Sequence, residues 1–140
     1  RDNGDRGGYL HEGYSGLLAA LAAQGRLGEA SDVGAEALRT SRQIDDPSWI
    51  AQHAAELGAL ALDRDRLADA EGLLSESLAL RQKRGEYTVP ESEVLIARLR
   101  LERGKWDEAH RLAEKASGEF AAAGRKADQA DAGAVAVPAE

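Results

Sequence analysis

A six-residue element occurs three times in this chain of 140 residues, and it limits the possible folds more than any other feature of the sequence. Its copies read GRLGEA, DRLADA and GKWDEA, at residues 25–30, 65–70 and 104–109. Each copy begins with Gly or Asp, continues with a basic and a large apolar residue, and ends in an acidic residue and Ala. The copies start 40 and 39 residues apart, and a fixed period of this size is typical of proteins built from stacked structural repeats.

The amino-acid composition favours helices. Apolar residues make up 43% of the chain but aromatic residues only 4%, so the core has to be built mainly from Leu and Ala, which are strong helix formers. Residues that favour strands, the β-branched ones, are few. We therefore expect an all-α protein of one domain.

Charge and composition exclude several classes of partner. With a net charge of −7 and no basic stripe, the chain is not expected to bind nucleic acid. It contains no Cys, which excludes disulfides and thiolate chemistry and fits a cytoplasmic protein. No apolar run reaches the roughly 20 residues that a membrane-spanning helix needs, so no membrane is expected as a partner.

Apolar residues recur at helical spacing in six stretches, and we expect helices over residues 9–24, 27–43, 47–63, 67–83, 90–103 and 106–123. Asp46 and Pro47 predict an N-cap followed by a first helical residue, and Thr88 with Glu91 has the spacing of a capping box. Each short turn makes its two helices antiparallel neighbours. The organisation predicted is a flexible lead-in at 1–8, repeats at 9–45, 46–86 and 87–123, and a partial fourth repeat or capping helix with a frayed tail at 124–140.

These features resemble the tetratricopeptide repeat (TPR) family, whose repeats have large and small residues at fixed places, a turn Gly, and Ala on the second helix. In the first repeat the matching positions are Tyr14, Leu17, Leu18, Leu21, Gly25, Ala30, Gly34 and Ala37. Three residues depart from the pattern: Gly34 is small where a large residue is usual, and Glu93 and Arg100 are charged at positions that are normally buried. Either the third repeat is shifted by one residue, or the stems of these two charged residues cover apolar surface while their heads reach water.

The period of about 40 is longer than the standard 34 and is similar to the repeats of kinesin light chains and of large bacterial regulators. The resemblance implies a superhelical stack of antiparallel helix hairpins, a TPR-like α-solenoid, that binds a protein or peptide on its concave face. That face would present Glu12, Gln52, Glu56, Asp63, Val94, Leu95, Arg98 and Glu102. A peptide with a basic residue and an apolar anchor would complement such a face, whereas the alternative is that these charges are simply solvated.

No constellation of catalytic, metal-binding or cofactor-binding residues is visible. His53 with Glu56 and His110 with Glu114 share helix faces, but a metal site needs three or four converging ligands, so we expect His11, His53 and His110 on the surface. Trp106 is interpreted as packing between the paired helices, and Trp49 is interpreted as packing under the Asp46–Pro47 corner, with exposure for binding as the alternative.

The expected function is therefore a non-catalytic binding module, part of a bacterial regulatory or signalling protein, without cofactor. A sensor of a small ligand or signalling peptide and a structural oligomerisation spacer remain alternatives. Apolar ends of the repeat stack would favour a homodimer.

Overall fold

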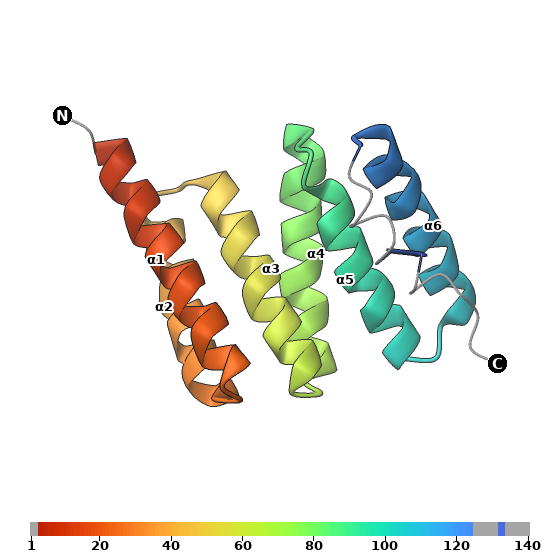
Figure 1. The fold of residues 1–140 in the computed structure, drawn as a ribbon, viewed down its shortest axis with the longest axis horizontal. Coiled ribbons are helices and arrows are strands. Elements are labelled where there is room, and N and C mark those ends of the chain that lie inside the picture. The colour runs from red at the N-terminus through yellow and green to blue at the C-terminus, as the bar shows by residue number, and fades with distance from the viewer. Residues whose placement is uncertain (1–2, 125–131, 134–140) are drawn as a thin grey trace. The chain divides into compact units, whose positions relative to one another are not determined.

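The computed structural model describes residues 3–124 and 132–133 of the chain, and these residues contain helices and turns but no strand. The helices are α1 (Asn3–Ala23), α2 (Leu27–Gln43), α3 (Pro47–Asp63), α4 (Leu67–Arg84), α5 (Val89–Glu102) and α6 (Trp106–Ala122). Neighbouring helices pack in the order of the sequence, as Figure 1 shows for α1, α2 and α3 and for α5 and α6. The prediction of an all-α fold made of helix hairpins is therefore confirmed.

The chain forms two compact units, residues 1–73 and residues 74–140, which we call unit 1 and unit 2. In unit 1, α2 packs against both α1 and α3, and α1 also contacts α3. In unit 2, α5 packs against α6. None of the described helices is long and apolar enough to cross a membrane.

The repeated element forms the turn inside each hairpin. Its first residue has a left-handed backbone in all three copies, with φ of 76° at Gly25, 58° at Asp65 and 75° at Gly104. The next backbone N–H then donates to a carbonyl five residues earlier; in the first copy, for example, Arg26 N lies 2.9 Å from Leu21 O. Left-handed conformation at this place is the usual way to end a helix, and it explains why Gly or Asp begins every copy.

The Ala that closes each copy lies at the contact between paired helices. Ala30, Ala70 and Ala109 are at most 1% exposed. In unit 1, Ala30 packs in a core with Leu18, Leu21 and Leu60, which come from α1 and α3. A small residue is needed here because it lets helix backbones approach closely.

Gly34, the first departure from the TPR pattern, is explained by the packing of its neighbours. A Cβ atom added to Gly34 would lie 3.0 Å from Leu57 Cδ1 and 3.1 Å from Leu18 Cδ1. These two Leu side chains occupy the volume that a large residue at position 34 would fill. The space between α2 and its neighbours is therefore filled from α1 and α3 and not from α2 itself.

The predicted helix boundaries of α2 and α3 match the structure, and those of α4, α5 and α6 differ by one residue. The start of α1 was predicted wrongly: the helix begins at Asn3 instead of Tyr9, so residues 3–8 are helical and are not a lead-in. The Gly residues that suggested a lead-in lower helix propensity by about 1 kcal/mol each, but no Pro stops the helix, and every added residue gains a backbone hydrogen bond. Most of the predicted C-terminal segment at 124–140 lies outside the described residues.

The two predicted helix caps have different outcomes. Asp46 is the N-cap of α3, and its carboxylate accepts hydrogen bonds from the backbone of Ser48 (3.1 Å) and Trp49 (3.3 Å). Thr88 is the N-cap of α5, but its side chain makes no capping hydrogen bond and donates to Glu86 Oε1 instead (3.2 Å). The capping box predicted for Thr88 and Glu91 is therefore wrong, because the Thr88 hydroxyl donates its hydrogen bond to a nearby carboxylate instead of capping the helix.

Candidate functional site

Four of the predicted binding residues lie in unit 1, on α1 and α3. Gln52, Glu56 and Asp63 are spaced by four and seven residues, so they follow one face of α3. Glu12 and Asp63 are exposed, and Gln52 and Glu56 are half-buried. Ser15, one turn after Glu12 on α1, lies close enough to Glu56 to influence its carboxyl group. We call the four predicted binding residues of unit 1 together the acidic face: Glu12, Gln52, Glu56 and Asp63.

The Glu56 carboxylate is held in a fixed position on the acidic face. Gln52 Nε2 donates to Glu56 Oε2 (2.9 Å), and His53 Nδ1 lies 2.9 Å from Glu56 Oε1. The Ser15 hydroxyl has no hydrogen bond of good geometry, so we assign the positioning to Gln52 and His53. Burial acts to raise the pKa of Glu56, but the interactions with His53, Ser15 and Gln52 outweigh it and lower the pKa below its usual value. The group is therefore an ionised carboxylate at neutral pH.

The His53 ring connects Glu56 to α1. His53 Nε2 lies 2.9 Å from His11 Nδ1, and the side chains of both His residues are fully buried. The prediction that these two residues lie on the surface is therefore wrong, although His110 is exposed as expected. Sequence spacing alone could not reveal the pair, because its members lie 42 residues apart on different helices.

The proton positions along His11, His53 and Glu56 follow from the acceptor at the end of the chain. An ionised carboxylate can only accept, so His53 Nδ1 donates to Glu56; in the tautomer whose Nε2 carries no proton, His53 accepts at Nε2 from His11 Nδ1. His11 Nε2 is then a buried acceptor, and it has no hydrogen-bond partner among the described residues. Burial, followed by the proximity of His53, lowers the pKa of His11, while Asp46 opposes this effect. Both nitrogens of His53 are engaged, which leaves neither of them to activate a hydroxyl nucleophile.

Trp49 packs over this pair of His residues, as its interpretation as a packing residue requires. Its ring stacks on His11 with centroids 5.0 Å apart and on His53 with centroids 5.3 Å apart. Tyr14 approaches His53 edge-on at 6.2 Å. Aromatic neighbours of this kind exclude water from the hydrogen-bonded His residues and help to fix their rings.

The other four predicted binding residues lie in unit 2, on α5. Arg98 and Glu102 are exposed and Leu95 is half-buried. Val94 is half-buried and packs against a core of Ala116, Phe120 and Ala132. Part of the Val94 side chain is therefore already covered within unit 2, which reduces what it can offer to a partner.

Two further expectations in unit 2 are corrected by the structure. Glu93 was expected to reach water, but its side chain is fully buried and pairs with Lys115 of α6. Burial, with Glu119 nearby, raises the pKa of Glu93 to about 7 although Lys115 acts in the opposite direction. Trp106 was interpreted as a packing residue, yet it is 56% exposed, because it is the first residue of α6, at the edge of the helix pair. Arg100 is half-buried and its guanidinium lies 4.0 Å from Glu108.

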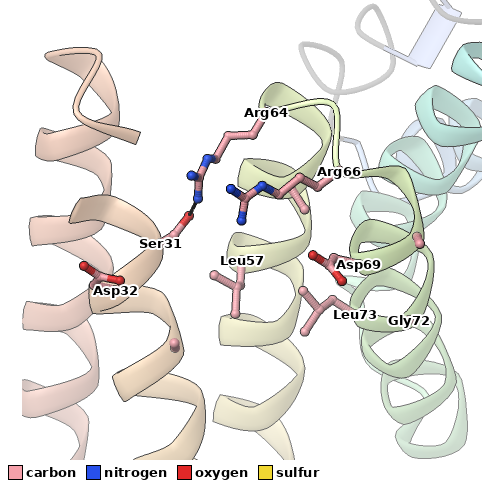
Figure 2. Close-up of a pocket in the computed structure, with 11 residues that line it drawn as sticks. Ser31, Asp32, Leu57, Arg64, Arg66, Asp69, Gly72 and Leu73 are labelled. Atoms are coloured by element: carbon pink, nitrogen blue, oxygen red, sulfur yellow. Dashed lines mark hydrogen bonds between the residues drawn. The ribbon is translucent and has the colours of Figure 1, made fainter. Parts of the chain in front are cut away.

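A pocket of about 610 Å³ lies elsewhere in unit 1, between α2, α3 and the start of α4. Leu57, Ala61 and Leu73 give it an apolar lining, and Arg64 and Arg66 come from the turn between α3 and α4. Figure 2 shows both guanidinium groups extending into the space beside α2, where Arg64 Nη1 donates to Ser31 Oγ (3.1 Å). This site was not predicted from the sequence, since two Arg residues near a turn are not distinctive without knowledge of where their side chains point.

Within the part of the chain that the structure describes, no group of three or more His, Asp or Glu side chains is arranged to hold a metal ion. Comparison of the sequence with known protein families and with curated proteins finds no match in either.

Proposed function

We propose that this chain is a non-catalytic protein- or peptide-binding module of the TPR type, part of a bacterial regulatory or signalling protein, and that it binds through the acidic face. The repeated turn with its buried Ala and the packing of helix hairpins support the TPR assignment. The proposal depends most on one observation: the ionised Glu56 carboxylate is fixed by Gln52 and His53, and no Lys or Arg among the described residues forms an ion pair with it.

A fixed carboxylate of this kind favours a partner with a basic side chain. Its orientation is set before binding, so a cation that reaches it loses less free energy to the ordering of the site. The Glu56 side chain is 17% exposed, which leaves an edge of the carboxylate accessible. Glu12 and Asp63 add negative charge to the same face and would attract the same basic partner from a distance.

The proposal can be tested with peptides selected on the intact chain. Peptides of about 12 residues, the length of three helical turns, would be selected from a phage-displayed library, synthesised, and measured by fluorescence polarisation against the wild-type chain and Glu56→Gln. We expect selected peptides to contain Lys or Arg, and Glu56→Gln to weaken their binding by at least about fivefold, as the loss of one charge-assisted contact should. Glu36→Gln is the matched control, because this substitution removes the same charge from an exposed residue on α2. Peptides without basic residues, or equal binding to Glu56→Gln, would refute the proposal.

A second candidate function, oligomerisation through an end of the repeat stack, is favoured by a different observation. Leu10 and Leu17 of α1 are 48% and 52% exposed, and they lie seven residues apart on one face of the helix. Light scattering after size-exclusion chromatography would detect a dimer as the concentration rises, and Leu17→Gln should reduce it. A monomer at every concentration would exclude this role.

A further inference from the structure

The pocket between α2, α3 and α4 contains two cations that share one space. Arg64 and Arg66 both line it, and Figure 2 shows their guanidinium groups on the same side, above Leu57. Among the described residues neither guanidinium forms an ion pair; Arg64 donates to the neutral Ser31 hydroxyl. Like charges that lie near one another repel, so an anion placed between them would be stabilised by both.

The corresponding pocket of unit 2 shows what is unusual here. Five lining positions recur 39 residues later, where a pocket of about 500 Å³ is found: Leu57 and Ile96, Ala61 and Arg100, Asp69 and Glu108, Gly72 and Arg111, Leu73 and Leu112. In unit 2, Arg side chains replace Ala61 and Gly72, and one of them pairs with Glu108. In unit 1 the small residues leave room, and the turn residues Arg64 and Arg66 extend into it. Among the described residues, the two cations of unit 1 therefore lack an ion-pair partner of the kind that Glu108 provides in unit 2.

We infer that this pocket binds a carboxylate side chain of a partner protein, next to an apolar residue of about the size of Leu. Two planar guanidinium groups can each donate two hydrogen bonds to a carboxylate, and Ser31 already orients one of them. The apolar lining by Leu57, Ala61 and Leu73 accommodates the neighbouring apolar side chain.

The charges at the rim favour a carboxylate over a phosphate. Asp32 and Asp69 also line the pocket, so its formal charges sum to zero. A phosphate dianion would meet these two carboxylates, and it would approach a chain whose net charge is −7. A single carboxylate gains the contacts with both Arg residues at less cost in repulsion.

The acidic face would bind a basic side chain of a partner, and this pocket would bind an acidic one. The inference rests on the proposed function only because it takes the occupant of the pocket to be a protein. On α3 the acidic face and the pocket are separated by roughly 100° of rotation, since Glu56 and Leu57 are consecutive residues. A partner or pair of partners could therefore occupy both surfaces at once.

Nuclear magnetic resonance titration of the 140-residue chain with defined probes tests whether the pocket prefers a carboxylate. The probes are acetyl-Leu-Glu-Leu-amide, the same peptide with Gln for Glu, and inorganic phosphate, followed through the Nε–Hε signals of Arg64 and Arg66. We expect saturable shifts at millimolar concentrations of the Glu peptide and at least about fivefold weaker binding of the Gln peptide, which lacks the charge-assisted hydrogen bonds. Arg66→Gln should reduce the affinity for the Glu peptide to that for the Gln peptide.

A control variant shows whether binding of the Glu peptide depends on this pocket alone. Arg103→Gln removes the same charge at the turn position of unit 2 that corresponds to Arg64, where the side chain is exposed and does not line the pocket, and it should have no effect. The Glu peptide contains no basic residue, so its binding is measured separately from that of the basic peptides expected on the acidic face, and failure of the acidic-face proposal and failure of this inference are distinguishable. Equal affinity for the Glu and Gln peptides, tighter binding of phosphate than of the Glu peptide, or wild-type affinity in Arg66→Gln would each overturn the inference.

Discussion

Replacing Gly34 tests whether the close packing of α2 determines the arrangement of unit 1. A Cβ at this position would lie 3.0 Å from Leu57 Cδ1 and 3.1 Å from Leu18 Cδ1. Carbon atoms in contact prefer separations of about 3.5–4.0 Å, so each Leu methyl group has to move by roughly half an ångström. Overpacking of this kind costs about 1–3 kcal/mol, whereas replacing Gly by Ala inside a helix gains about 1 kcal/mol. We therefore expect Gly34→Ala to lower the free energy of unfolding by about 0–2 kcal/mol.

The matched control is Gly72→Ala, because a Cβ on Gly72 of α4 has no neighbour within 4 Å. This variant should gain the helix propensity alone and become more stable by about 1 kcal/mol. The difference between the two variants, about 1–3 kcal/mol, isolates the packing cost at Gly34. Gly34→Leu, which places at position 34 the large residue usual in TPR repeats, should lose more still.

Urea unfolding followed by far-ultraviolet circular dichroism measures these differences. Equal stabilisation by Gly34→Ala and Gly72→Ala would mean that Leu18 and Leu57 move aside without cost. In that case the small residue at position 34 would not be required by packing, and the physical reason given for this departure from the repeat pattern would be wrong.

Three further predictions concern titration and turn geometry. Burial lowers the pKa of His11, so the contribution of the neutral ring to the free energy of unfolding should be fully present above pH 6.5, the unfolded value, and decrease as the pH falls below it. Thermal unfolding of His11→Phe should lack this pH dependence. An unchanged profile would contradict the burial of a neutral ring. Glu93 should have the opposite pH dependence, because its pKa is raised from 4.5 to about 7. Its contribution to the free energy of unfolding is present below pH 4.5 and is lost as the pH rises to 7, and Glu93→Gln should remove this loss. Asp65→Gly should stabilise the chain by up to about 1 kcal/mol, because Asp65 has a φ of 58°, and a destabilised variant would show that the Asp side chain itself is needed.

Those parts of the fold that depend on neighbouring residues could be predicted from the sequence. Turn position and helix period are local properties, so the boundaries of α2 to α6 agree to within one residue. The N-cap of α3 was predicted for the same reason, since the two backbone N–H groups that Asp46 caps are only two and three residues away.

Features that depend on distant residues were missed. His11 and His53 were expected on the surface because His is usually exposed, and only the contact between α1 and α3 makes them a buried pair. Glu93 contacts Lys115 of α6, which lies 22 residues away in the sequence, so its burial could not be inferred from local spacing. For the same reason, the positions of Gln52, Glu56 and Asp63 on one face of α3 could be predicted from helix period, while the fixing of Glu56 through the His pair could not.

Few positions in the hairpins of this chain require one particular type of residue. A left-handed residue at the turn and a small residue five positions later recur in each hairpin, as Gly25 with Ala30 and Asp65 with Ala70 show. Elsewhere the core has to be filled, but it does not matter which residue fills it. Leu57 fills the space beside Gly34, so a large residue is not needed at position 34. A partner would therefore be selected by residues that this framework leaves unconstrained. In unit 1 the Glu56 carboxylate and the Arg64–Arg66 pair are two such groups, and among the described residues neither is neutralised by an ion pair with Lys, Arg, Asp or Glu.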